Sequence, residues 1–184
     1  MNTLELIREA KRGSAAAQKY LFDQFARKML LVCQRYVKNP EDAEELLLNG
    51  FYKFFTKISS FDYQGDGALY AWLKRIMVNE CLMFLRAKNV FTIVTEATAE
   101  DIPLQEEALD NLSAEEIFNL IIQLPVGYRT VFNLYAIEGM AHKEIAELLN
   151  ISQGTSRSQF SKAKILLQKI LSQNEIKYVK RRSQ

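Results

Sequence analysis

Residues 142–164 read HKEIAELLNISQGTSRSQFSKAK and predict two helices with almost no linker between them. The first helix is expected over Lys143–Leu149, with its apolar residues on one side. Asn150 occupies the turn, because asparagine tolerates a left-handed backbone better than any residue except glycine. Ser152 is expected to cap the second helix. The pattern is typical of a helix-turn-helix, which predicts an all-α fold around it.

The second of these helices has two different faces. At about 100° per residue, one face collects Ser156, Phe160, Ala163, Leu167 and Ile170. The opposite face is basic and rich in hydroxyl groups, and its candidate DNA contacts are Thr155, Arg157, Ser158, Ser161, Lys162 and Lys164. The short side chains let the backbone approach a major groove, and an arginine can bind guanine or phosphate. A helical hairpin with a solvated basic face remains the alternative.

The composition excludes several classes of protein. The 184 residues are 48% hydrophobic and 25% charged, with only seven Gly and three Pro, which favours long helices. The apolar runs are too short for a membrane span and there is no N-terminal signal segment, so we expect no membrane insertion. Cys33 and Cys81 lie in apolar helical patterns, as small buried hydrophobes do. We therefore expect a reducing cytoplasm and no disulfide framework.

The charge is distributed unevenly along the chain. Residues 1–88 carry a net charge of +4, residues 89–119 carry −8, and residues 120–184 carry +6. Two basic blocks joined by an acidic segment indicate two surfaces for a polyanion and a middle segment that does not bind it.

The helix signals predict two helical domains. Residues 1–88 form the first domain, with caps at Ser14 and Asn39-Pro40 and a third helix over about Ala68–Ala87. Residues 89–112 are expected to be an acidic, partly extended linker. Residues 113–184 form the second domain. It opens on a Ser113–Glu116 capping box, includes a helix over Tyr128–Ile137, and ends in a basic tail expected to be mobile.

The C-terminal block resembles region 4 of an extracytoplasmic-function (group 4) RNA polymerase sigma factor. The segment from Leu124 to Leu171 follows the family's order of motifs. The matching positions are Leu124-Pro125, Arg129, Glu138-Gly139, Glu144-Ile145-Ala146 and Gly154-Thr155.

The N-terminal block resembles region 2 of the same family. NPEDAEELLLNGFYKFF, residues 39–55, matches an acidic helix followed by aromatic residues. ALYAWLKRIMVNECLMFLR, residues 68–86, matches through Trp72, Leu73, Arg75, Ile76, Asn79, Leu85 and Arg86. Two motif sets in the family's order, across about residues 14–172, make the resemblance specific.

The resemblance implies a function and a set of partners. Region 2 would bind the clamp helices of the polymerase β′ subunit and open the −10 element, and region 4 would read the −35 element and meet the flap of the β subunit. The linker would follow the path of nascent RNA. Promoter DNA and core RNA polymerase are the implied partners, and an anti-sigma factor is a further one.

Site residues can be assigned from the same resemblance. The −10 candidates are Trp72, Lys74, Arg75 and Asn79, with the Phe61–Ala68 loop as a pocket for a flipped base. Core packing is the alternative role for Trp72. The polymerase-binding candidates are Asp42, Glu44, Glu45, Leu48 and Asn49; compensation of the helix dipole is the alternative for the three carboxylates.

Three positions depart from the family's pattern. Leu48-Asn49 stands where a Gln-Glu pair is usual, Met83 where Asp is usual, and Ser156 where an apolar residue is common. The first departure predicts a more apolar contact with the clamp, and Phe160 is expected to fill the gap beside Ser156.

Two other functions compete with a sigma factor. The first is a stand-alone helix-turn-helix regulator with an N-terminal partner domain, which would bind a palindromic operator without polymerase. The second is an enzyme, but His142 has no Glu-x-x-His partner and no phosphate-binding glycine loop is present. We therefore expect no catalysis, no cofactor and no metal site.

Overall fold

The computed structural model describes residues 2–88 and 113–182. The regular structure in these two stretches consists of helices, without a strand, which confirms the predicted all-α class. The chain divides into two compact units, Met1–Leu85 and Arg86–Gln184, called here the N-terminal and C-terminal units. The linker predicted at 89–112 falls outside the described residues, and the domain boundaries stay predictions.

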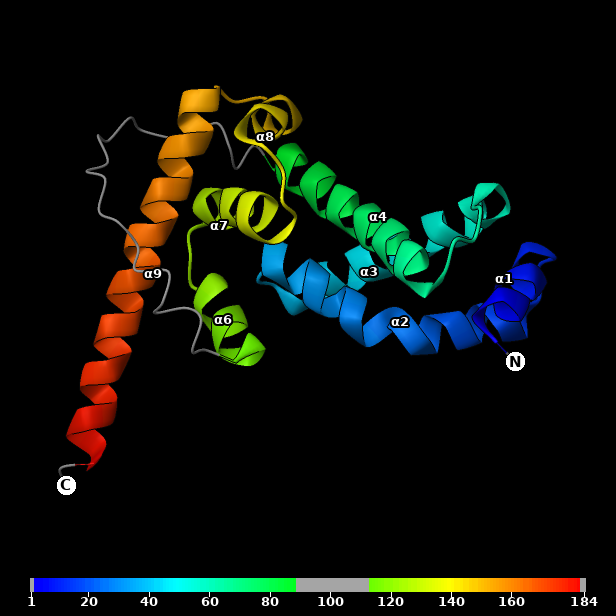
Figure 1. Ribbon diagram of the computed structural model, residues 1–184, viewed down its shortest axis with the longest axis horizontal. Coiled ribbons are helices and arrows are strands. Elements are labelled where there is room, and N and C mark those ends of the chain that lie inside the picture. The colour runs from blue at the N-terminus through cyan, green and yellow to red at the C-terminus, as the bar shows by residue number, and fades with distance from the viewer. Residues whose placement is uncertain (1, 89–112, 183–184) are drawn as a thin grey trace. The chain divides into compact units, whose positions relative to one another are not determined.

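The N-terminal unit is built from four α-helices and a short 3₁₀ turn in the described part of the chain (blue to green in Figure 1). In chain order they are α1 (Thr3–Lys11), α2 (Ala15–Tyr36), α3 (Pro40–Lys57), η1 (Ile58–Ser60) and α4 (Asp66–Ala87). α2 packs against both α1 and α3.

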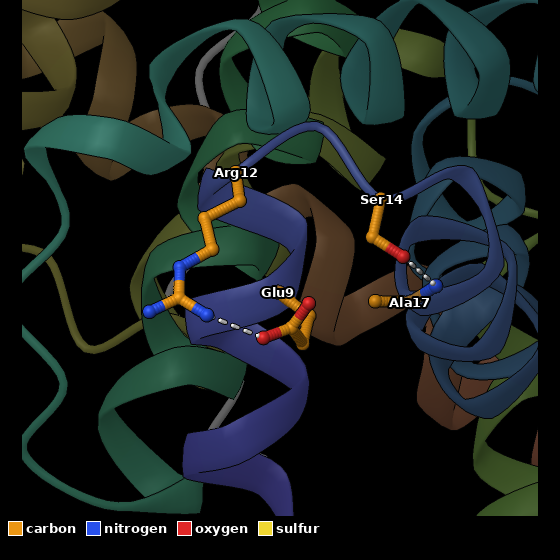
Figure 2. A network of polar contacts seen from close by, with 4 residues as sticks. All are labelled: Glu9, Arg12, Ser14 and Ala17. Atoms are coloured by element: carbon orange, nitrogen blue, oxygen red, sulfur yellow. Dashed lines mark hydrogen bonds and ion pairs between the residues drawn. The ribbon is translucent and has the colours of Figure 1, made fainter.

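The turn between α1 and α2 follows the predicted signals (Figure 2). Gly13 has φ +84°, a left-handed backbone that glycine adopts without strain. The Ser14 hydroxyl accepts a hydrogen bond from the Ala17 N–H at 3.4 Å, and Arg12 pairs with Glu9 at 2.8 Å. A glycine turn followed by a serine cap therefore separates the two helices.

The remaining caps of this unit are also local. The Asn39 side chain accepts a hydrogen bond from the Asp42 N–H at 2.8 Å, and Pro40 stands in the first turn of α3, where its missing N–H costs nothing. The core gathers Leu21, Met29, Tyr36, Phe54, Leu69, Leu73, Met77 and Leu82, each at most 1% exposed. Cys33 and Cys81 are fully buried free thiols, as predicted.

The C-terminal unit contains the helix-turn-helix. Its described elements are α6 (Ala114–Ile121), α7 (Val126–Phe132), η2 (Asn133–Ile137), α8 (His142–Leu149) and α9 (Gln153–Arg182), which is the long orange-to-red helix of Figure 1. α6 begins at the predicted Ser113–Glu116 capping box. The core of the C-terminal unit is formed by Leu120, Ile121, Leu124, Phe132, Ala163 and Leu167.

The structure adds detail to two expectations about this unit. The helix predicted over Tyr128–Ile137 is present as α7 followed directly by η2, a π-helical turn that ends at Ile137 and after which the Glu138 N–H donates to the Asn133 carbonyl at 2.9 Å. The backbone of α9 continues through the predicted basic tail to Arg182, and the mobility of the tail stays a prediction. No glycine or proline follows Gly154, so nothing in the sequence stops the helix earlier.

In the described ranges, no helix is long and apolar enough to cross a membrane. The same ranges hold no cluster of three or more His, Cys, Asp or Glu side chains that could bind a metal ion.

Candidate nucleic-acid and polymerase interfaces

The turn between α8 and α9 has the predicted geometry. Asn150 adopts φ 54° and ψ 49°, the left-handed conformation that ends α8. The Ile151 N–H then donates to the Ala146 carbonyl at 3.0 Å. The Ser152 hydroxyl accepts from the Thr155 N–H at 2.9 Å and so caps α9. Only three residues, Asn150, Ile151 and Ser152, therefore separate the end of α8 from the start of α9.

α9 packs one face against its own unit and leaves the other accessible. Ser156, Ala163 and Leu167 are buried, with Phe160 and Ile170 half-buried beside them. Arg157 is exposed on the opposite arc. The other −35 candidates, which are half-buried, are Thr155, Ser158, Ser161, Lys162 and Lys164.

The accessible arc has two rows. Arg157, Ser161 and Lys164 follow one another at spacings of four and three, and therefore share one side of the helix. Ser158 and Lys162 form the neighbouring row. Lys164 lies over the ring of Phe160, with its Nζ 5.3 Å from the ring centroid. The six candidates thus lie on one continuous surface, and their contact with DNA stays a prediction.

Several polar residues of this unit are buried, and only Ser156 among them was placed on a packed face from the sequence. Arg129, Thr130, Asn133, Ser156 and Gln159 are all at most 3% exposed. Burial lowers the pKa of Arg129 to about 10, so the side chain stays charged at neutral pH, and its Nη1 donates to the Leu124 carbonyl at 3.0 Å. An amphipathic pattern assigns polar residues to the surface, so the burial of the other four, unlike that of Ser156, was not predicted.

Gln159 shows how tightly α9 approaches α7. A Cβ atom added at Gly127 would lie 3.1 Å from the Gln159 side-chain oxygen. The fully buried amide of Gln159 therefore fits where α7 has no side chain. The only sequence signal for this contact is that residue 127 is a glycine, and it does not indicate which residue fills the space.

His142, which sequence reasoning set aside as a solitary histidine, lies beside the recognition helix. Its Nδ1 is 2.9 Å from the Ser156 hydroxyl, and its ring stacks on Tyr135 with centroids 4.3 Å apart. Phe160, which was expected to fill the space beside Ser156, packs against Tyr135 at 4.5 Å and against His142 at 5.8 Å between ring centroids, and its filling of that space stays a prediction. The polar partner of Ser156 is His142.

In the N-terminal unit, α3 presents an acidic and apolar face. Glu44, Glu45, Leu48 and Asn49 are exposed and Asp42 is half-buried. The opposite side of α3 is buried through Ala43, Leu46, Leu47, Gly50, Phe51 and Phe54. All five polymerase-binding candidates thus lie outside the core, and their contact with polymerase stays a prediction.

Tyr52 belongs to this face but was not among the candidates. Its side chain is 74% exposed, and it lies one turn after Leu48, which is 58% exposed. The two apolar groups follow Glu44 and Glu45 along the helix. The spacing of four from Leu48 was the available signal.

α4 brings three of the four −10 candidates to one side. Trp72 is half-buried, whereas Arg75 and Asn79 are exposed. Arg75 lies three residues after Trp72 and Asn79 four residues after Arg75, so the three share one side of the helix. Lys74 is separated from Trp72 by about 200° around the helix. The residues that share the Trp72 side are Arg75, Asn79 and Met83, which is 51% exposed.

Trp72 is held by two other aromatic rings. Phe61 stacks on it with centroids 4.6 Å apart and an interplanar angle of 10°, and Phe54 is tilted against it at 5.1 Å. Phe61 begins the loop before α4, and its carbonyl accepts a hydrogen bond from the Lys11 Nζ at 2.5 Å. Trp72 is therefore part of the packing and also lies at the loop that was expected to hold a flipped base.

Comparison with known protein families assigns both units. Residues 21–90 match the family model described as Sigma-70 region 2. Residues 114–167 match the one described as Sigma-70, region 4. The two models cover the elements on which the candidate faces lie.

Curated proteins are similar over about nine tenths of this chain and of their own length. RNA polymerase sigma-H factor of Pseudomonas aeruginosa is 28% identical over 180 residues, covering 91% of this chain and 92% of that protein. ECF RNA polymerase sigma factor SigW of Bacillus subtilis is 28% identical over 179 residues, covering 90% of this chain and 94% of that protein.

A solved structure is also similar, that of the sigma factor RpoE in complex with the anti-sigma factor NepR from Bartonella quintana. It is 22% identical with a TM-score of 0.46, and covers 84% of this chain and 96% of that chain. From the two family models and the curated relatives, the chain belongs to the sigma-70 family of RNA polymerase sigma factors, within its extracytoplasmic-function group, and acts in transcription initiation.

Proposed function

We propose that this chain directs promoter-specific initiation as a subunit of RNA polymerase, with no catalysis of its own. The observation that carries the proposal is the helix-turn-helix. One face of α9 packs against the core of the unit, and hydroxyl and basic groups stay accessible on the other face. α9 enters the major groove of the −35 element, and the N-terminal unit binds polymerase and opens the −10 element.

Arg157 is the principal base-reading residue in this proposal. It is exposed near the N-terminal end of α9, the end of a recognition helix that contacts base edges. Its guanidinium can bind guanine through two hydrogen bonds. Lys162 and Lys164 lie one to two turns further on and would bind phosphates, which fix the orientation of the helix on the duplex.

α4 and the Phe61–Ala68 loop open the −10 element in this proposal. The stacked rings of Trp72 and Phe61 form a rigid aromatic surface at the loop. A nucleobase that has left the DNA stack can pack against this surface. Arg75 and Asn79 are exposed beside it and can bind phosphate and base edges. Lys74, on another side of α4, is the weakest of the four candidates.

The exposed face of α3 binds the clamp helices of the β′ subunit. Glu44 and Glu45 supply charge for a basic partner, and Leu48 adds an apolar contact. The C-terminal unit meets the flap of the β subunit, and an anti-sigma factor is a further partner that the family suggests. These roles place the protein in the cytoplasm, with the transcription machinery.

A two-variant experiment tests the division of labour between the units. Holoenzyme carrying Arg157→Ala should lose about 5-fold to 150-fold in affinity for promoters with the preferred −35 base, because one bidentate contact is worth about 1–3 kcal/mol. Lys169→Ala, an exposed basic residue three turns along α9, serves as its control and should leave promoter choice unchanged. Unchanged footprints and promoter choice for Arg157→Ala would remove this face from the interface.

The second variant, Asn79→Ala, should bind promoters as closed complexes but open them poorly. Permanganate reactivity of −10 thymines measures the opening, and Gln24→Ala, an exposed amide on α2, is its control. Normal reactivity in Asn79→Ala would show that this side of α4 does not act in strand opening.

A further inference from the structure

The hydroxyl of Ser156 is buried on the packed side of the recognition helix. Ser156 is 0% exposed and lies on the same packed side of α9 as Ala163 and Leu167, which are also buried further along the helix. A buried hydroxyl without a partner lowers stability, so its one cross-helix partner is informative. That partner is His142 Nδ1, at 2.9 Å.

The partner comes from a different helix. His142 is the first residue of α8, whereas Ser156 lies in the first turn of α9, so the bond joins the two helices of the motif. The imidazole is itself fixed, because it stacks on Tyr135 of η2 with an interplanar angle of 12° and meets the edge of Phe160 at 5.8 Å. A hydrogen bond is directional, so a bond to a fixed ring restrains rotation of α9 about its own axis. Apolar contacts alone would restrain this rotation less.

The rotation of α9 determines where its accessible side chains point. The surface of a helix lies about 5–6 Å from its axis, so a rotation of about 20° moves a surface group by roughly 2 Å. Side chains that bind a ligand together tolerate a displacement of only about 0.5 Å from the productive geometry. Arg157 directly follows Ser156, and Lys164 lies over Phe160 in the same cluster.

We propose that His142 and Ser156 form a positioning pair that sets the rotation of α9 and thereby aims Arg157 at promoter DNA. This inference rests on the proposed function. Neither residue needs to touch DNA: both act through Arg157. The pair makes position 156, where this chain departs from the apolar residue common in the family, part of the reading of the −35 element.

Two single variants and their combination test the pair in reconstituted holoenzyme. His142→Phe keeps a ring for stacking on Tyr135 but removes the bond, and Ser156→Ala removes the hydroxyl. Each should lower about 5-fold the discrimination between two promoter duplexes that differ at the −35 base pair read by Arg157. The double variant should lose less than the product of the two single losses, because paired removal leaves no polar group unmatched.

Controls separate positioning from general loss of structure. Ser172→Ala removes a hydroxyl that bonds only its own helix, to the Gln168 carbonyl at 3.1 Å, and should leave discrimination unchanged. In an Arg157→Ala background, His142→Phe should produce no further loss at that base pair. The dependence of affinity on salt should also be unchanged in His142→Phe, because the long, flexible side chains of Lys162 and Lys164 still reach phosphates after a small rotation of α9.

The chain offers a direct spectroscopic readout as well. His142 is its only histidine, so the imidazole nitrogen signals of the ¹⁵N-labelled protein are assigned without ambiguity. Ser156→Ala should shift the Nδ1 resonance and change the tautomer balance, and this measurement remains decisive if a variant binds promoters too weakly to assay.

The outcomes distinguish this inference from the proposed function. Wild-type holoenzyme that does not discriminate at the −35 element contradicts the proposed function itself. Wild-type discrimination that survives both single variants, losses that persist in the Arg157→Ala background, or an Nδ1 resonance unaffected by Ser156→Ala overturns the positioning pair alone.

Discussion

Gly50 allows α3 to approach a side chain of α4. A Cβ atom added there would lie 2.2 Å from the sulfur of Met77, which is itself fully buried. Gly50→Ala should therefore lower the free energy of unfolding by about 1–3 kcal/mol, because a filled core must shift to admit one carbon. Urea unfolding followed by circular dichroism measures the change.

Gly67 provides the matched control, because an added Cβ there meets no atom within 4 Å. Gly67→Ala should be neutral or stabilising, since alanine favours a helix and restricts the unfolded chain. Equal stabilities for the two variants would mean that α3 and α4 are not packed as closely as described.

His142 makes stability depend on pH in a definite direction. Burial lowers its pKa from the usual 6.5, and the positive charge of Arg157 lowers it further. Between 6.5 and this lowered pKa the unfolded chain binds more protons than the folded chain, so stability falls as the pH falls through this interval.

The comparison with His142→Phe isolates this contribution, because the variant has no group that titrates there. The difference in unfolding free energy, wild type minus variant, should be largest above pH 6.5 and decrease as the pH falls below it. A difference that is constant or grows on acidification would contradict the burial of the imidazole beside Arg157.

At the scale of single residues, the sequence predicted the apolar core better than the polar one. Leu21, Met29 and Cys33 were placed inside from their spacing, and each is fully buried. Gln159 could not be placed, because its burial depends on the missing side chain of Gly127 in another helix. Tyr52 was missed because an aromatic residue is ordinarily assigned to a core.

At the scale of elements, an ion pair joins α3 to α4. Lys53 Nζ lies 2.7 Å from the Glu80 carboxylate, and the Glu80 side chain is only 10% exposed. Lys53→Met should lower the free energy of unfolding by about 1–3 kcal/mol, because it leaves a largely buried carboxylate without its partner.

An exposed pair on α2 is the control for that variant. Lys19 and Asp23 are 75% and 57% exposed, so Lys19→Met should cost at most about 0.5 kcal/mol. If Lys53→Met is no more destabilising than Lys19→Met in thermal or urea unfolding, the pair does not join the two helices.

Element boundaries were predictable where the signal is local. The caps at Ser14, Asn39, Ser113 and Ser152 and the left-handed Asn150 each depend on a few consecutive residues, and each is present. The π-helical form of η2 was not predictable, because the residues there, Asn133–Ile137, carry no local signal that separates a π-helical turn from an α-helical one. The continuation of the α9 backbone to Arg182 was not predicted, because a basic composition was taken as a sign of mobility.

At the scale of the whole molecule, two units with different exposed faces serve one process. The acidic face of α3 and the aromatic side of α4 belong to the N-terminal unit, and the basic face of α9 belongs to the C-terminal unit. The net charges of +4 and +6 on either side of an acidic segment suit two contacts with one polyanion. In the proposed function both units bind one promoter within the polymerase complex, so their arrangement there could not be predicted from one chain.

Transcription in vitro by core RNA polymerase, with and without the purified chain and followed by mapping of start sites, tests the central claim most directly. We predict that the chain binds core polymerase, and that new transcripts begin at a set of promoters sharing −35 and −10 elements. Failure to bind core polymerase at any reasonable salt concentration, together with binding of the chain alone to a palindromic operator, would contradict the claim and identify a stand-alone regulator.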